Sequence, residues 1–513
     1  KIVSGLENSV EIELYLAGEL EPGLRNIQAE ILEKVAVLNA YSAKPIRIRI
    51  FDPYSISNPE KQDKFINTLV EKGVSRTSFR RKTEMGVVTK YIFPGAVIRY
   101  GRKEMAVNFL KNNPAFSYEM NFNHSVETIE FELVNAFQKL MRTKKSTVVF
   151  LQGHGEANQF EISDFANELS ADFKVEMLTA DELKNNQTDI LIVANPREVF
   201  DEKSKFIIDQ FIMKGGKVVW LIDPVRVSLD SLSSGYQTFS FPRDLNLGDQ
   251  LFRYGVRLNY DLLQDVNCIR IKVNTAAAGN QPKFTLHPWY YSPLLTPNDN
   301  HPISRNLNWV MGEFVSSIDT LAGNPNIDKQ VILSTSPNAR IVKSPSSVSL
   351  QNINNPPARQ LFTRSYIPVG VILEGEFTSV FKNRMVENYG FPLSVVVNKS
   401  KPTKMVVIAD GSIITNKVNY STNPPGIYKL GFDRVSQRTF GNKEFLTNTI
   451  FYLNDNAGIM QLRGRSLKLR LLNKVKLREE KVFWQVINVL LPLLLIVVFG
   501  LIYNIVRRYR YTR

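Results

Sequence analysis

The chain has 513 residues, too many for one compact core, so its length predicts two or more domains. Hydrophobic residues make up 43% and charged residues 22%, which excludes a disordered protein and a polytopic membrane protein. The formal net charge is +15, of which residues 463–513 carry +10. A basic segment beside an apolar one is typical of contact with anionic lipid, so the charge favours a membrane surface over nucleic acid as the partner.

Cysteine and histidine are scarce. Cys268 is the only cysteine, which excludes an intramolecular disulfide, and we expect it to be a buried, small apolar residue. The four histidines are scattered, so we predict no metal site and no cofactor. The chain begins with Lys1 instead of methionine, which suggests a processed N-terminus.

Residues 1–145 predict a small α/β domain. The expected elements are strand 10–16, helix 22–41, strand 46–51, helix 58–72, strands 87–93, 95–100 and 104–109, and a helix from Ser125 to Met141. This order, with Pro94 before the hairpin, resembles a thioredoxin-like domain. The loop at 17–22 has no thiol, so we expect a scaffold without redox chemistry.

Residues 146–460 predict a second α/β domain. The expected strands are 147–151, 173–178, 189–194, 218–222, 369–373 and 404–409, with helices after residue 156, at 202–214 and at 443–454. Apolar strands between helices indicate a doubly wound, flavodoxin-like parallel sheet that is covered on both faces. Residues 225–337 are rich in Asn, Pro and Ser, and we expect a long insertion with a helix near 247–263.

Residues 482–506 predict one transmembrane helix. They contain no charged residue and, at 1.5 Å per residue, are long enough to cross a hydrocarbon layer of about 30 Å. A basic juxtamembrane segment at 461–481 precedes them and a basic tail at 507–513 follows. Because basic residues lie on both sides, charge alone does not assign the sidedness of the anchor.

Several residues of this segment are candidates for contact with the membrane or a partner. Gln485, Asn488 and Asn504 can hydrogen-bond to a neighbouring helix, or alternatively to headgroups and water. The predicted docking residues are Trp484, Gln485, Asn488, Pro492, Tyr503, Asn504, Arg507 and Arg508.

A Gly-His-Gly-Glu sequence follows strand 147–151, at the place where doubly wound sheets bind ligands. The alternative, which the residues favour, is a tight turn in which the histidine makes a local hydrogen bond. Asn195 and Asp223 follow two other strands, and Glu156, Asp223 and Asp410 are candidates to meet in one crevice. The candidate ligand-binding residues are Gly153, His154, Gly155, Glu156, Asn195 and Asp223.

Catalytic motifs are missing from the sequence. Gly216-Lys217 lacks the earlier glycine and the hydroxyl of a P-loop, and no Gly-x-Ser-x-Gly occurs. Cys268 lies in an apparent strand instead of on the sharp turn that a nucleophile needs. We therefore predict that the chain is not an enzyme.

Short motifs occur in a characteristic order along nearly the whole chain. They are Asp52-Pro53, 153–156, Asn195-Pro196, Gly-Gly to Asp-Pro at 215–224, Glu-Gly-x-Phe at 374–377, Ala-Asp-Gly at 409–411 and the apolar helix with its arginine tail. On these motifs the chain resembles the auxiliary subunits of gliding-motility ABC transporters and the wider family of ABC-transporter auxiliary proteins.

The resemblance implies an amidotransferase-like α/β domain without the catalytic cysteine, similar to one in intraflagellar transport proteins. It also implies a non-catalytic subunit in the inner membrane, with a separate permease and a separate ATPase as partners. The body would lie in the periplasm and the C-terminal tail in the cytoplasm. The resemblance is also compatible with assembly into a homo-oligomer. Family members usually begin with a transmembrane helix, which this chain lacks. Two alternatives stay open: a membrane-tethered glycan- or ligand-binding module, and an amidotransferase-like hydrolase.

Overall fold

The computed structural model describes residues 2–83, 86–111, 117–142, 144–227, 232, 237–274, 281, 283–323, 325–350, 356–464 and 480–511. The chain forms two compact units, Lys1–Arg465 and Ser466–Arg513. Most of the predicted basic segment at 461–481 lies outside the described residues, as do the last two residues of the tail.

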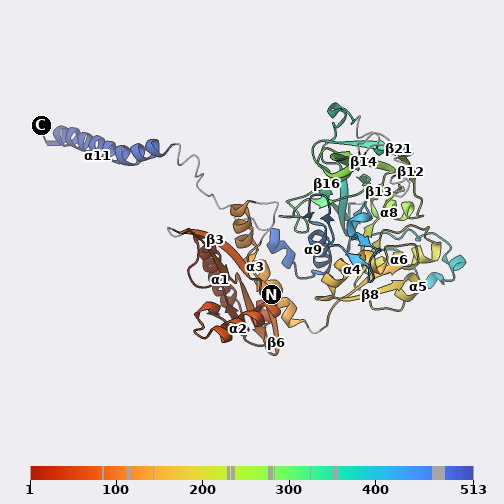
Figure 1. The fold of residues 1–513 in the computed structure, drawn as a ribbon, viewed down its shortest axis with the longest axis horizontal. Helices are drawn as coiled ribbons and strands as arrows, with labels where there is room; N and C mark the ends of the chain where they lie inside the picture. The colour runs from red at the N-terminus through yellow and green to blue at the C-terminus, as the bar shows by residue number, and fades with distance from the viewer. Residues whose placement is uncertain are drawn as a thin grey trace. The chain divides into compact units, whose positions relative to one another are not determined.

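The N-terminal part of the first unit contains a four-stranded sheet with helices (Figure 1). Its elements are η1 (Val3–Gly5), β1 (Val10–Leu14), α1 (Pro22–Ala40), β2 (Ile46–Ile50), η2 (Pro53–Ser55), α2 (Pro59–Glu71), β3 (Thr77–Thr83), β4 (Gly86–Ile92), β5 (Gly95–Tyr100), β6 (Lys103–Asn108) and α3 (Tyr118–Met141). The strand order is β2-β1-β5-β6, with β1 parallel to β2 and antiparallel to β5. Strand β3, which the sequence did not predict, pairs with β4 in a separate hairpin.

The core of this part follows from the spacing of apolar residues. Ile12 of β1 and Ile31 of α1 are 2% and 0% exposed and belong to one buried cluster together with Leu133 of α3. Burying each such side chain stabilises the fold by about 1.5–3 kcal/mol.

The start of α3 corrects the prediction that Ser125 caps this helix. The helix begins at Tyr118, because Ser117 is the N-cap and its Oγ accepts a hydrogen bond from Met120 N at 3.2 Å. Ser125 lies about two turns further in, where its hydroxyl donates to the carbonyl of Asn121.

A large mixed sheet dominates the rest of the first unit. The elements up to its middle are β7 (Thr147–Gln152), α4 (Gln159–Ser170), β8 (Lys174–Thr179), α5 (Ala180–Leu183), β9 (Ile190–Ala194), α6 (Glu202–Met213), β10 (Lys217–Leu221), β11 (Val225–Arg226), β12 (Gln237–Pro242), α8 (Gly248–Tyr254), β13 (Val256–Leu258), β14 (Asp261–Asp265), β15 (Cys268–Asn274), β16 (Phe284–Pro297), β17 (Val310–Met311), β18 (Ile318–Thr320), β19 (Ile327–Ser334), β20 (Ala339–Lys343) and β21 (Ser346–Ser349). The remaining elements are η4 (Arg359–Leu361), β22 (Pro368–Gly375), η5 (Val386–Tyr389), η6 (Leu393–Val395), β23 (Thr403–Ile408), η7 (Ser412–Ile414), β24 (Val418–Asn419), β25 (Gly426–Ile427), β26 (Phe432–Asp433), β27 (Arg438–Thr439), α9 (Asn442–Asn454) and η8 (Ile459–Gly464).

The strand order of the large sheet is β15-β16-β19-β22-β23-β10-β9-β7-β8. Neighbours from β23 to β8 are parallel, and neighbours from β15 to β23 are antiparallel. The prediction of a parallel sheet is therefore correct for one half only. Both late strands that were expected to complete the sheet, at 369–373 and 404–409, do so as β22 and β23.

Helices cover both faces of the parallel half, because successive side chains of a strand point to opposite faces. Phe150 of β7 belongs to a buried cluster with Phe165 of α4 and Phe445 of α9. Its neighbour Leu151 belongs to a second cluster with Phe206 of α6.

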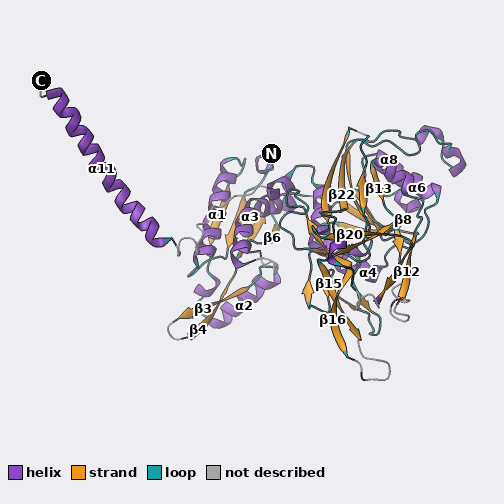
Figure 2. Cartoon of the chain, turned by 90° about the horizontal axis from the view of Figure 1, so that it is seen from above, coloured by secondary structure: helices purple, strands orange, loops and turns teal. Residues whose placement is uncertain are grey.

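The described part of the segment expected to be a long insertion is mainly β-structure. It supplies β15, β16 and β19 to the large sheet, and Figure 2 shows the long strand β16 beside β15. The helix expected near 247–263 ends at Tyr254, because Gly255 has a left-handed φ of 107°. The residues after Gly255 form β13 and β14 instead.

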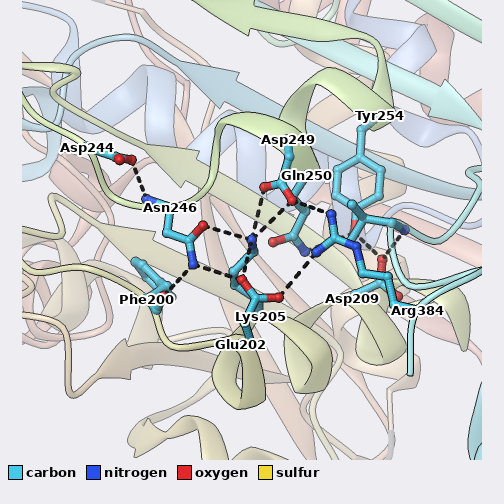
Figure 3. A network of polar contacts seen from close by, with 11 residues as sticks. Phe200, Glu202, Lys205, Asp209, Asp244, Asn246, Asp249, Gln250, Tyr254 and Arg384 are labelled. Atoms are coloured by element: carbon cyan, nitrogen blue, oxygen red, sulfur yellow. Dashed lines mark hydrogen bonds and ion pairs between the residues drawn. The ribbon is translucent and has the colours of Figure 1, made fainter. Parts of the chain in front are cut away.

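A polar network joins α6, α8 and the loop after β22 (Figure 3). The Lys205 side chain is 1% exposed, and its ammonium group lies 3.1 Å from Glu202 Oε1 and 3.0 Å from Asp249 Oδ1. Arg384 bridges the same two carboxylates at 3.2 and 2.7 Å. Asn246 accepts from Lys205 at 3.2 Å and donates to the carbonyl of Phe200 at 2.9 Å. The network therefore fixes the loop that leads into α6.

The second unit is described by α11 (Lys481–Tyr511), a 31-residue helix with Pro492 inside it. Its residues from Phe483 to Tyr511 are long and apolar enough to cross a membrane, and its apolar side chains are exposed. The helix extends beyond the predicted end at residue 506, so Arg507 and Arg508 are helical.

Candidate functional site

The carboxyl ends of four parallel strands meet at one edge of the large sheet. Strands β7, β9, β10 and β23 are neighbours there, and all run in the same direction. Gly153, Asn195, Asp223 and Asp410 follow these strands within two residues of their ends. This edge is where ligands bind in open α/β sheets.

The turn at 153–156 requires its two glycines. Gly153 and Gly155 have φ values of 116° and 66°, which side chains with a Cβ rarely adopt. A Cβ on Gly155 would also lie 3.2 Å from Arg197 Cβ and from Glu198 Cγ. The turn is therefore packed closely under the loop that follows β9.

The polar atoms of this turn are used within the protein. His154 N donates to Glu156 Oε2 at 2.7 Å, and His154 Nδ1 lies 3.2 Å from Glu156 Oε1. The His154 ring stacks on the Phe200 ring with ring centres 3.8 Å apart. The backbone carbonyl of His154 accepts hydrogen bonds from Arg197 N and Glu198 N, both at 2.9 Å. Both His154 and Glu156 are 7% exposed. The geometry is that of the tight turn with a local histidine hydrogen bond.

Asn195 has an unusual conformation at the end of β9. Its φ is 52°, its backbone N–H donates to Leu221 O at 2.9 Å, and its side chain is buried at 7% exposure. Among the described residues, its Oδ1 has no hydrogen-bond partner. A Cβ on Gly411 would lie 2.6 Å from this oxygen, so the glycine leaves room for the amide.

Asp223 and Asp410 lie next to each other after β10 and β23. Asp223 Oδ1 accepts from Gly411 N at 2.6 Å. Asp410 is fully buried and accepts from Ser412 N at 2.7 Å, Ser412 Oγ at 2.6 Å and Glu313 N at 3.0 Å. The third acid of the predicted trio, Glu156, is not with them, because it faces His154.

Burial raises the pKa of both aspartates. For Asp410, the negative charge of Asp223 raises the pKa further, against the hydrogen bonds from Ser412 and Glu313. For Asp223, the hydrogen bond from Gly411 and the charge of Arg243 lower the pKa, but by less than burial raises it. Two buried like charges are costly, so the folded protein favours a pair that keeps one proton.

Asn195 and Asp223 line a cavity of about 310 Å³, whereas residues 153–156 do not. Its charged lining residues are Glu161, Arg197, Asp223, Arg243, Glu313 and Lys417. Two ion pairs account for four of these: Arg197 with Glu161 at 3.2 Å and Lys417 with Glu313 at 2.5 Å. Asp223 and Arg243 are the two charged groups left over.

Sequence reasoning missed Arg243, Glu313 and Lys417 as members of this site. Arg243 follows β12 and Glu313 follows β17, both inside the segment that was expected to be an insertion. No motif marks them, because their position depends on how that segment folds back onto the sheet.

The cysteine of this chain is poorly suited to nucleophilic chemistry. Cys268 lies at the start of β15, and burial raises the pKa of its thiol to about 12, which disfavours the thiolate. Within the described ranges, no cluster of His, Cys, Asp and Glu has the geometry to hold a metal ion. The cavity lined by Asp223 and Arg243 is suited to binding a charged ligand, and the Asp223–Asp410 pair is suited to holding a proton.

The predicted docking residues all lie on α11. At 100° per residue, Gln485, Asn488, Pro492 and Tyr503 fall within about 60° of arc on one face. Asn504 lies about 100° from Tyr503, on a different face. The indole N–H of Trp484 donates to Glu480 at 2.9 Å, near the start of the helix.

Comparison with known proteins identifies the family. Residues 145–449 match the family model described as an ABC-type uncharacterized transport system, and residues 1–99 match a domain of unknown function, DUF7088. The first match covers most of the large mixed sheet, so this part of the chain is that of a transport-associated protein. The chain belongs to the family of ABC-type uncharacterized transport systems. It is an auxiliary component of such a transport system.

No curated protein matches this chain. Among solved structures, the mmIFT52 N-terminal domain aligns with 13% identity and a TM-score of 0.34, over 61% of this chain and 99% of that one. The exo-beta-1,4-mannosidase Op5Man5 from Opitutaceae bacterium strain TAV5 aligns with 10% identity and a TM-score of 0.23, over 65% of this chain and 39% of that one.

Proposed function

We propose that this chain is the non-catalytic auxiliary subunit of a gliding-motility ABC transporter. Helix α11 anchors it in the inner membrane and docks against a permease that works with a separate ATPase. The body lies in the periplasm and the arginine tail in the cytoplasm. The family match over 145–449 supports the transport association, and the motif order in the sequence motivates the gliding-motility assignment.

Two features support a scaffold role for the body. The strand order β2-β1-β5-β6 is compatible with a thioredoxin-like domain, and residues 17–22 contain no cysteine. The large sheet is compatible with an amidotransferase-like domain, and Cys268 lies at the start of β15, where burial raises the pKa of its thiol. Under this proposal, the two domains serve as a scaffold and not as catalysts.

The observation that carries the proposal is the polar face of α11. Gln485 and Asn488 are exposed and share a face with Pro492 and Tyr503. Polar side chains on a lipid-exposed helix gain when they hydrogen-bond to another helix, by about 0.6 kcal/mol each on average. A permease helix would supply such partners.

The test is recovery of the permease when the tagged full-length chain is purified in mild detergent from native membranes. We expect Gln485→Leu with Asn488→Leu to reduce recovery severalfold, because two interhelical hydrogen bonds are lost. Leu490→Ala with Leu494→Ala, on the opposite face of α11, is the matched control and should leave recovery unchanged. Equal recovery with both double variants would reject docking through this face.

A ligand-binding module is the second candidate function. The observation that favours it is the cavity at the sheet edge, which Asp223 and Arg243 line without forming an ion pair with another described residue. Binding at the 153–156 turn has less support, since the polar atoms of His154 and Glu156 satisfy each other.

A further inference from the structure

Arg243 is a half-buried cation without a carboxylate partner in the described part of the chain. Its Nη1 donates a hydrogen bond to the carbonyl of Pro196 at 3.3 Å. Burial lowers the pKa of the guanidinium, and the charge of Asp223 opposes that effect without an ion pair between the two groups. A guanidinium presents five N–H donors in a planar fork that matches a carboxylate, so an anionic group in the cavity would satisfy it.

Asp223 is the complementary group. One of its oxygens accepts from Gly411 N, and the carboxyl lines the same cavity as Arg243. Asp410 lies directly behind it and takes three hydrogen bonds of its own. A cationic group placed at Asp223 would offset the repulsion between the two carboxylates.

Asn195 is a further polar group in the wall of this cavity. Its side chain is more than nine-tenths buried, and among the described residues its Oδ1 accepts no hydrogen bond. The oxygen itself is enclosed, so an N–H donor on a ligand would satisfy it only after the amide turns toward the cavity.

We propose that this cavity binds a small zwitterion whose carboxylate pairs with Arg243 and whose ammonium group pairs with Asp223. An anion alone would leave the aspartate pair uncompensated, and a cation alone would leave Arg243 unpaired. The other cations that face the cavity, Arg197 and Lys417, already have Glu161 and Glu313 as partners. The volume of about 310 Å³ lies at the small end of the range for ligand pockets and suits an amino acid or a dipeptide. The inference rests on the second candidate function and is independent of docking to a permease.

Binding should also release protons. In the free protein, Asp223 and Asp410 together favour holding one proton. A ligand ammonium group next to Asp223 lowers the free energy of the state in which both acids are ionised. The charged groups around the pair are Arg243, Arg197, Glu313 and Lys417. We therefore expect release of a fraction of a proton per bound zwitterion near neutral pH.

The test uses the full chain in detergent. A thermal-shift screen with the twenty common amino acids and the dipeptide Ala-Ala, each at millimolar concentration, should find at least one compound that raises the unfolding temperature. Calorimetry of that compound should give a Kd at least about tenfold lower than for its N-acetylated and its amidated forms, since each lacks one charge. Titration in two buffers of different ionisation enthalpy should reveal the released proton.

The variants separate a binding role from a structural one. Asp223→Asn keeps the acceptor for Gly411 N, and it should abolish proton release and weaken binding at least about tenfold. Arg243→Gln should weaken binding by at least about the same factor. Asp181→Asn and Arg359→Gln, at exposed positions outside the cavity, are the matched controls. No thermal shift with any probe, or equal binding of the N-acetylated and amidated forms, would overturn the proposal. Failure of this test leaves the co-purification of the permease unaffected, so the two proposals fail separately.

Discussion

The Asp223 carboxylate accepts a 2.6 Å hydrogen bond from Gly411, the residue directly after the buried Asp410. This bond joins the loops that follow β10 and β23, two adjacent parallel strands. It therefore holds two acids side by side at the edge where the sheet is open to a ligand.

Gly411→Ala tests the packing at this edge. The new Cβ would lie 2.6 Å from Asn195 Oδ1 and Cγ, so the Asn195 side chain must move. We expect a loss of about 1–3 kcal/mol in the free energy of unfolding, as for other overpacked sites. Chemical denaturation of the full chain measures it. Gly323→Ala is the control, because a Cβ there meets nothing within 4 Å, and equal losses would contradict the role of Gly411.

The aspartate pair predicts a stability that falls as the pH rises. Both folded pKa values are raised, so the folded state binds more protons than the unfolded state above the ordinary carboxyl pKa near 4. The stabilising effect is fully present below that pH and is lost as the pH rises through the raised values. In Asp223→Asn, removal of one acid also removes the repulsion on Asp410. We expect a flatter dependence of the unfolding temperature between pH 5 and pH 8, whereas Asp181→Asn should keep the wild-type slope.

His301 predicts a separate loss of stability in acid. The side chain is 3% exposed, its Nδ1 accepts from Ile303 N at 3.2 Å, and burial lowers its pKa to about 4. The stability from the neutral ring is fully present above about pH 6.5 and is lost as the pH falls toward 4, by about 3 kcal/mol. His301→Asn keeps an acceptor and should remove this part of the acid loss in denaturation curves. His287→Asn, at a partly exposed position on β16, should not.

The buried network around Lys205 predicts unequal effects of two lysines on one helix. Lys205→Met keeps the volume of the stem but takes away a cation shared by Glu202 and Asp249, which then rely on Arg384 alone. We expect a loss of about 2 kcal/mol in the free energy of unfolding, because the two carboxylates are partly screened by solvent. Lys203→Met breaks an exposed pair with Asp181 and should cost less than about 1 kcal/mol. Similar losses for the two variants would mean that the network adds little stability.

Sequence patterns predicted the parts of the fold that depend on local order. Asn195, Asp223 and Asp410 were expected at one edge because each directly follows an apolar strand, and the structure places them there. Glu156 was expected with them, but it lies two residues from His154 and bonds to it, a contact that needs no tertiary partner.

Other features were missed, either because they depend on distant contacts or because a local signal was read at the wrong residue. Arg243 and Glu313 reach the cavity only because residues 225–337 fold back as β-structure along the sheet. The cap of α3 was placed at Ser125 instead of Ser117 because both serines precede apolar residues at helical spacing. The end of α8 was missed, although Gly255 is a typical helix terminator followed by an alternating pattern.

Helix α11 is longer than a bilayer requires. Its 31 residues span about 46 Å, whereas a hydrocarbon layer is about 30 Å thick. The extra length would let the helix tilt in a thin bilayer. In a bilayer of another thickness, its last turn, which carries arginines, would extend further among the headgroups. As a membrane anchor, a helix of this length would be matched to no single membrane thickness, and its depth would be set by where Trp484 and the terminal arginines reach the interface.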